Sequence, residues 1–156
     1  MNNIERLTPQ QQYEEDCRYM RLAIEEARAA AAQGEVPIGA VIIAGGRVIG
    51  RGHNLTETLT DVTAHAEMQA ITAAAQTLGG KYLQKATLYV TVEPCLMCAG
   101  AIGWSQLQRI VIGAPDPKRG YSVYTDRPFH PRATVTTGVL ADECAALVTS
   151  FFAARR

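Results

Sequence analysis

Two short stretches near the middle of the chain carry the residue types that bind a transition metal. TAHAEM contains His65 and Glu67, and EPCLMC contains Cys95 and Cys98. In the first turn of a helix, two cysteines three residues apart can direct their sulfurs to one point. The free N–H groups and the helix dipole at that end favour the thiolate, which is the form that binds metal.

A ligand set of one nitrogen and two sulfurs would leave zinc with one open position. His65, Cys95 and Cys98 would hold tetrahedral zinc, whereas a structural site would be closed by a fourth protein ligand. Zinc lowers the pKa of a bound water to about 7. Glu67 would take a proton from that water and deliver it to a leaving group. The pattern predicts a catalytic centre for hydrolytic attack on an electron-poor ring carbon, with loss of ammonia.

Other interpretations of the cysteine pair are open at this point. A C-x-x-C pair is also typical of redox proteins, but such a pair would leave His65 and Glu67 without a role. A structural zinc site would need Cys17 or Cys144, and each falls on the apolar face of its expected helix, where a buried thiol is the ordinary outcome. A non-catalytic zinc-binding domain would have no use for Glu67.

The composition is that of a compact domain without a charge bias. The chain has 156 residues, of which 47% are hydrophobic, with 15 basic and 15 acidic side chains. This supplies enough apolar material for one core. Zero net charge gives no support to a nucleic-acid or membrane partner, although a local basic patch would still allow nucleic-acid binding. We find no signal peptide and no stretch as long as a membrane span, and therefore expect a cytoplasmic protein.

Hydrophobic periodicity predicts the elements that would position these residues. Strands and helices that alternate after a hairpin indicate a three-layer α/β/α domain, an α/β fold whose central mixed sheet has helices on both faces. We expect residues 1–156 to form a single domain, with residues 1–10 flexible. The expected helices are 11–33, 63–77, one opening at Pro94-Cys95, and 142–154, and the five expected strands are 38–44, 47–53, 86–92, 108–112 and 134–139.

The combination of H-A-E and P-C-x-x-C resembles the signature of the zinc-dependent nucleoside and nucleobase deaminases. A likeness to the tRNA adenosine deaminase branch extends over nearly the whole chain after residue 20. The resemblance implies a cytidine-deaminase-like fold, a Zn²⁺ cofactor, a homodimer, and conversion of adenosine to inosine at the wobble position of the tRNA anticodon loop. The matching stretches are EVPIGAVI, HN, TAHAE, LYVTVEPCLMCAGAI, IGAPDPKRG and GVLADECAALVTSFF.

The resemblance also implies roles for single residues. His65, Cys95 and Cys98 match the zinc ligands of the family, and Glu67 matches its proton shuttle. Asn54 matches an asparagine that hydrogen-bonds the purine, and an amide can pair with an adenine-type edge through two hydrogen bonds.

Further positions match the walls of the family's substrate pocket. Ile38 matches an apolar wall against the base, and the backbone N–H groups of Ala66 and Cys95 would line the pocket. Asp116 and Lys118 match a segment that lies along the RNA in relatives. Ordinary roles are also open, because Ile38 could belong to the core and an aspartate before proline is a turn signal.

The segment 120–133 leaves the substrate open. Its two tyrosines, Phe129 and several basic residues would offer a stacking surface to unpaired bases, and an ordinary connecting loop is the alternative. Together with the zero net charge, this keeps a second hypothesis: a deaminase of a free nucleobase or nucleoside, of guanine or cytosine type.

Overall fold

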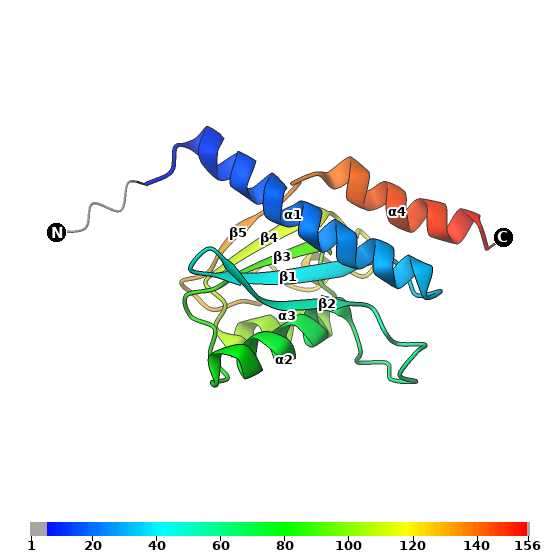
Figure 1. Cartoon of the computed structure of the whole chain (residues 1–156), viewed down its shortest axis with the longest axis horizontal. Coiled ribbons are helices and arrows are strands. Elements are labelled where there is room, and N and C mark those ends of the chain that lie inside the picture. The colour runs from blue at the N-terminus through cyan, green and yellow to red at the C-terminus, as the bar shows by residue number, and fades with distance from the viewer. Residues whose placement is uncertain (1–5, 156) are drawn as a thin grey trace.

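A mixed sheet forms the middle layer of the molecule (Figure 1). Its five strands are β1 (Gly39–Ala44), β2 (Arg47–His53), β3 (Thr87–Val92), β4 (Arg109–Ala114) and β5 (Thr134–Thr136). The order in the sheet is β2-β1-β3-β4-β5. β1 pairs antiparallel with β2 and β3, while β3 pairs parallel with β4 and β4 parallel with β5. The computed structural model describes residues 6–155 and confirms the expected mixed sheet.

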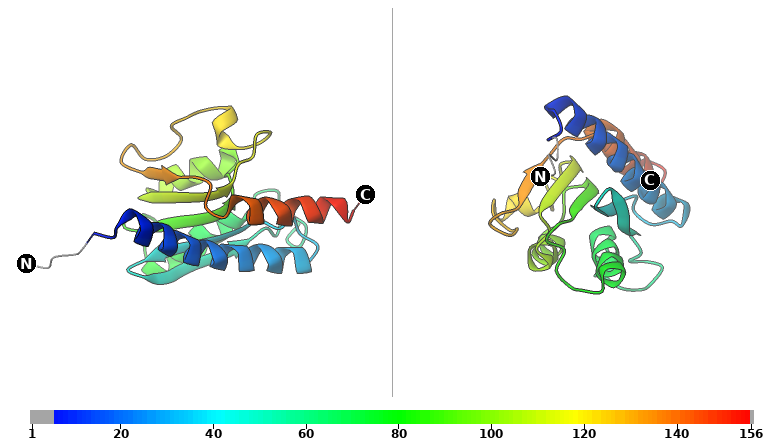
Figure 2. Two further views of the ribbon diagram at one scale, coloured as in Figure 1. Left: turned by 90° about the horizontal axis from the view of Figure 1, so that it is seen from above. Right: turned by 60° about the vertical axis from the view of Figure 1, so that its left-hand side comes forward.

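Helices cover both faces of this sheet (Figures 1 and 2). The helices are α1 (Pro9–Ala32), α2 (Ala66–Leu78), α3 (Leu96–Ser105) and α4 (Ala141–Ala153), with a short 3₁₀ turn η1 (Tyr121–Val123). One hydrophobic core lies between the sheet and α2 and α3, and a second lies between the sheet and α1 and α4. The three-layer α/β/α prediction is therefore confirmed.

The N-terminal prediction is wrong in part, because α1 begins inside the segment expected to be flexible. The Thr8 side chain accepts a hydrogen bond from the Gln11 backbone N–H, and the Gln11 side chain accepts one from the Thr8 N–H. Pro9 follows at the first helical position, where its missing N–H costs nothing. These signals fix the helix start, whereas residues 1–5 lie outside the described part of the chain.

Two glycines in β2 let α2 approach the sheet closely. A Cβ at Gly50 would collide with the α2 backbone at Ala70, and a Cβ at Gly52 would collide with it at Ala66. The first turn of α2 is thereby held against the sheet.

Within residues 6–155, no helix is long and apolar enough to cross a membrane.

A buried ion pair links α1 to Arg109, the first residue of β4. Asp16 is 2% exposed and accepts two hydrogen bonds from the Arg109 guanidinium, at 2.6 and 2.7 Å. The Tyr89 hydroxyl donates to Asp16 at 2.9 Å, and Arg109 also donates to Thr136. One network therefore joins α1, β3, β4 and β5.

Candidate active site

Three side chains converge at the N-termini of α2 and α3. The Nδ1 atom of His65 lies 3.6 Å from the Cys95 sulfur and 3.4 Å from the Cys98 sulfur. All donor atoms of the three residues lie within 4.8 Å of one another. A tetrahedral zinc with ordinary bond lengths separates a nitrogen ligand from a sulfur ligand by about 3.6 Å. The three residues therefore form a group able to bind a metal.

Both helices present their N-cap side chains to this point. His65 is the N-cap of α2 and Cys95 is the N-cap of α3, and neither side chain hydrogen-bonds its own helix. Both residues have extended backbone angles, so α2 begins at Ala66 and not at Thr63 as expected. The usual capping interaction is missing, which leaves the imidazole and the thiol free to bind a cation.

The two cysteines differ in their affinity for a proton. A hydrogen bond from Cys98 lowers the pKa of Cys95 to about 4, against the effect of burial and with help from His65. The same hydrogen bond, together with burial, raises the pKa of Cys98. The hydrogen bond to Cys95 also raises the pKa of His65.

Glu67 lies beside the three donors and is almost fully buried, with 3% of its surface exposed. Burial raises its pKa to about 7, although its own backbone N–H favours the charged form. A carboxyl group with a pKa near neutrality can both accept and donate a proton under physiological conditions.

One cavity of about 750 Å³ joins the predicted site residues. It opens beyond the carboxyl ends of β3 and β4, which is where open α/β sheets usually bind their ligands. Cys98 is fully buried and does not reach the cavity surface. The other eight predicted residues line the cavity: Ile38, Asn54, His65, Ala66, Glu67, Cys95, Asp116 and Lys118.

Asn54 is held in a defined orientation at the cavity wall. Its backbone N–H donates to the Ile38 carbonyl at 3.2 Å, and its Oδ1 accepts from the Thr56 N–H at 3.3 Å. A backbone N–H can only donate, so this contact identifies the oxygen end of the amide. The Nδ2 group keeps both protons for a ligand, while Oδ1 keeps one lone pair.

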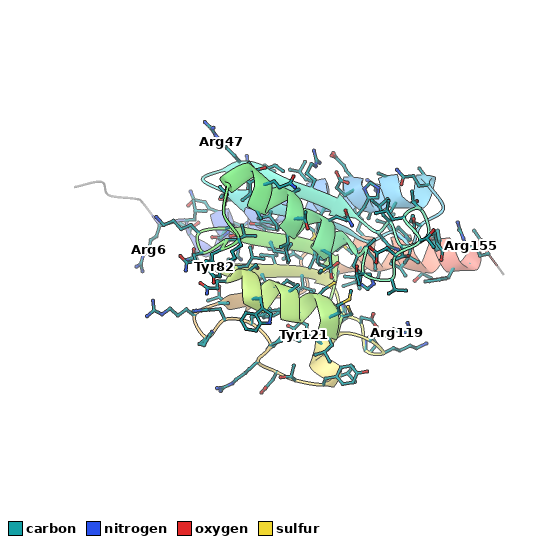
Figure 3. All side chains as sticks on the ribbon, turned by 90° about the horizontal axis from the view of Figure 1, so that it is seen from below. Arg6, Arg47, Tyr82, Arg119, Tyr121 and Arg155 are labelled. Atoms are coloured by element: carbon teal, nitrogen blue, oxygen red, sulfur yellow. The ribbon has the colours of Figure 1, made fainter. Side chains whose placement is uncertain are left out.

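Asp116 organises the turn after β4. Its Oδ1 accepts hydrogen bonds from the backbone N–H groups of Lys118 and Arg119, at 3.1 and 3.0 Å. Asp116 is therefore a turn residue, as the alternative interpretation held. The same turn also borders the cavity, and Figure 3 shows the Arg119 side chain extending away from the ribbon at this end of the molecule.

The segment 120–133 is divided between core and surface. Tyr121 is 8% exposed and packs edge-to-face on Phe129, with ring centroids 4.9 Å apart. Both rings contact the core beneath α2 and α3. Of the three aromatic side chains considered for stacking, only Tyr124 is well exposed, and the basic residues Arg127 and Arg132 are exposed as well. The packed aromatic pair therefore belongs to the core, while Tyr124 and the two arginines form the exposed part of the segment.

One wall of the cavity was not expected from the sequence. Helix α4 contributes Ala145, Val148, Thr149 and Phe152 to the lining. Phe152 is half-exposed although it follows the buried Phe151. The sequence did carry a signal, because Ala145, Val148 and Phe152 recur at the spacing of one helix face.

Metal donors at two helix N-termini and a buried glutamate beside them, on this fold, define a deaminase. The chain belongs to the MafB19-like deaminase family, because the model of that family matches residues 14–154. It is 48% identical over 139 residues to a tRNA-specific adenosine deaminase of Bacillus subtilis (strain 168), with 86% of each chain covered. It is 43% identical to the Agrobacterium fabrum enzyme of that name, over 88% of this chain and 94% of the relative. These relatives confirm the resemblance found in the sequence.

Solved structures agree with this assignment. A structure from studies of A-to-I editing by tRNA:A34 deaminases at the wobble position of transfer RNA superposes with a TM-score of 0.77 at 43% identity, covering 83% of this chain and 98% of that one. A guanine deaminase from Nitrosomonas europaea superposes with a TM-score of 0.74 at 26% identity, over 98% of both chains.

Proposed function

We propose that this chain hydrolyses adenosine to inosine and ammonia at the wobble position of tRNA. The observation that carries the proposal is the single cavity that joins a metal-donor cluster, a buried glutamate and an oriented asparagine. The 48% identity to a tRNA-specific adenosine deaminase supports tRNA as the substrate. The proposal treats residues 1–156 as one deaminase domain, supported by a family match over 14–154 and by one continuous sheet.

His65, Cys95 and Cys98 are proposed to hold Zn²⁺. The donor set of one imidazole and two thiols suits zinc, and the spacing of the nitrogen and sulfurs fits a tetrahedral ion. When bound, the metal would act as a Lewis acid that activates water for attack on the carbon bearing the amino group.

The remaining roles belong to residues around this cluster. Glu67 is proposed to accept the proton of the attacking water and to deliver a proton to the departing nitrogen. Asn54 would bind the base through Nδ2 and Oδ1, and Ile38 would pack against its face. The N–H groups of Ala66 and Cys95 lie where helices α2 and α3 begin and would favour negative charge in the cavity.

The turn containing Asp116 and Lys118 is proposed to meet the RNA backbone beside the extruded base. Lys118 and Arg119 are both exposed at the cavity mouth. A base must leave its stack to enter such a cavity, at a cost of a few kcal/mol that a single-stranded anticodon loop reduces.

A free-base deaminase is the second candidate. The superposition with a guanine deaminase over 98% of both chains supports it, although the identity is only 26%. Membership of a deaminase family leaves no support for a purely structural zinc domain.

An assay of inosine in unmodified tRNA, run beside ammonia release from free adenine, guanine, cytosine and their nucleosides, separates the two candidates. We expect inosine at the wobble position and little turnover of the free compounds. Faster turnover of a free base than of any tRNA would replace the proposal with the second candidate.

Metal analysis tests the ligand assignment. The purified wild-type chain should hold about one zinc. Cys98→Ser should lose most of it, while Cys144→Ser is a matched control because Cys144 is an equally buried thiol outside the donor cluster. Equal zinc in wild type and Cys98→Ser would refute the assignment.

A homodimer and a cytoplasmic location complete the proposal, both following from the resemblance to tRNA adenosine deaminases. Leu96, Met97 and Trp104 are exposed on α3, and Trp104 is 84% exposed. Large exposed apolar side chains on one helix are typical of a surface that a partner covers. Sedimentation equilibrium of wild type and Trp104→Ala would measure the mass, and a monomeric wild type would contradict the dimer.

A further inference from the structure

A second buried carboxylate lies near the cavity but outside the metal cluster. Glu35 is 0% exposed and follows the end of α1. Its oxygens accept three hydrogen bonds, from the Glu57 N–H at 3.1 Å, the Thr58 N–H at 2.7 Å and the Thr58 hydroxyl at 2.6 Å. All three donors belong to the loop between β2 and α2, so these hydrogen bonds attach the Glu35 carboxylate to that loop.

The backbone of Glu35 is fixed by the end of α1. The Glu35 N–H donates to the Ala30 carbonyl at 2.9 Å, and the Gly34 N–H donates to the Ala31 carbonyl at 3.0 Å. Gly34 has a φ of 77°, so the helix ends in a Schellman motif. Glu35 is thus rigidly attached to a helix of 24 residues.

The loop that Glu35 holds connects two residues of the site. It leaves β2 at Asn54 and enters α2 at His65 (Figure 1). Its two ends are close together, because the Leu55 N–H donates to the Ala64 carbonyl at 2.9 Å. Without the Glu35 carboxylate, the middle of this loop would lose three of the hydrogen bonds that hold it in place.

We propose that Glu35 is a positioning residue for the deaminase reaction. Its carboxylate fixes the 54–64 loop and thereby sets Asn54 against the substrate base. It lies outside the cavity lining and acts through the loop. This inference rests on the proposed function, because Asn54 is assigned there to the base. The side chain has to be a carboxylate, since two oxygens with four lone pairs can accept from three converging donors. A glutamine offers one oxygen and would turn an NH₂ group towards a donor.

Glu35→Gln is the first test, because it preserves the shape of the side chain. We expect faster amide hydrogen exchange at Glu57 and Thr58, and a fall of about 10- to 100-fold in kcat/KM for tRNA, since small displacements of a positioning group have effects of that size. The zinc content should be unchanged. Tyr89→Phe is the matched control, because it removes a buried hydrogen bond to a carboxylate at the far end of the sheet.

Thr58 supplies a second pair of variants that does not alter the charge. Thr58→Val removes the hydroxyl that donates to Glu35 and should reduce kcat/KM, whereas Thr58→Ser keeps the hydroxyl and should retain wild-type kinetics. In the double variant Glu35→Gln with Thr58→Val, the two effects should not add, because both remove the same interaction.

The outcomes separate this inference from the proposed function. A wild-type chain that is inactive on tRNA would overturn the proposed function alone, since amide exchange at Glu57 and Thr58 still tests the anchor. Wild-type exchange and kinetics in Glu35→Gln would overturn the positioning role. The same kinetic loss in Tyr89→Phe would also overturn it, because the loss would then follow from general destabilisation.

Discussion

Glu67 is almost fully buried and lies beside the three clustered donors. The effects of its removal on zinc binding and on turnover can therefore be measured separately. Glu67→Ala should keep its fold and its zinc, because the carboxylate is not one of the three clustered donors. Turnover should fall by about 10²- to 10⁴-fold, the usual contribution of a proton-transfer group. Metal analysis and inosine formation measure the two effects. A variant with near wild-type turnover would remove Glu67 from the mechanism, and exposed Glu14→Ala is the control.

Glu35 predicts a pH-dependent stability. Burial raises its pKa, but the Thr58 hydroxyl and the two loop amides outweigh this effect, so the net pKa lies below its ordinary value of 4.5. A lowered pKa in the folded state stabilises the protein above pH 4.5, and this stability is lost as the pH falls through the lowered value. Glutamine does not titrate, so the gap between wild type and Glu35→Gln should be about 1–3 kcal/mol at pH 7 and should shrink in acid.

Urea unfolding of both chains between pH 3 and 7 measures this gap. A gap that stays constant over the whole range would show that the charge of Glu35 does not contribute, whatever the effect of the substitution itself.

At the scale of elements, the turn after β4 places two exposed cations at the mouth of the cavity. Lys118→Ala and Arg119→Ala should each weaken binding to all RNAs alike and reduce the slope of log affinity against log salt by about one unit, because one cation fewer releases one counterion fewer. Binding isotherms at several salt concentrations measure this slope. Asn54→Ala should instead keep RNA affinity and cost about 1–3 kcal/mol in discrimination between bases.

Arg47→Ala is the matched control for these variants. Arg47 is an exposed cation in the β1–β2 hairpin, and Figure 3 shows it and Arg119 on opposite sides of the molecule. An equal change of slope in Arg47→Ala would mean that RNA binding follows net charge and not the cavity mouth.

For the whole molecule, the ion pairs that link α1 to the rest of the fold differ in burial, and two of them allow a direct comparison. Asp16→Ala should lower the free energy of unfolding by about 3–5 kcal/mol, because it leaves the largely buried Arg109 guanidinium without its partner. Glu143→Ala breaks an exposed pair with Arg28 and should cost about 1 kcal/mol or less. Urea unfolding compares the two variants, and equal losses would contradict a special role for the buried network.

The amino-acid sequence by itself was enough to predict the local features of this protein. Hydrophobic periodicity predicted the helices, the hairpin and the mixed sheet, because it acts over a few residues at fixed spacing. The three-residue spacing of Cys95 and Cys98, and the H-A-E pattern, predicted a group able to bind a metal with a carboxylate beside it, and the structure brings these side chains together. The start of α1 was also encoded locally, by Thr8, Pro9 and Gln11, but was assigned two residues too late.

What only the tertiary structure decided depends on residues far apart in the chain. Glu35 meets Thr58 across 23 positions, and Asp16 meets Arg109 across 93. The approach of α4 to the cavity and the burial that raises the pKa of Glu67 to about 7 likewise arise only when the layers pack. No short-range pattern carries such contacts, because burial and long-range hydrogen bonding are set by the packing of the whole chain and not by the spacing of neighbours.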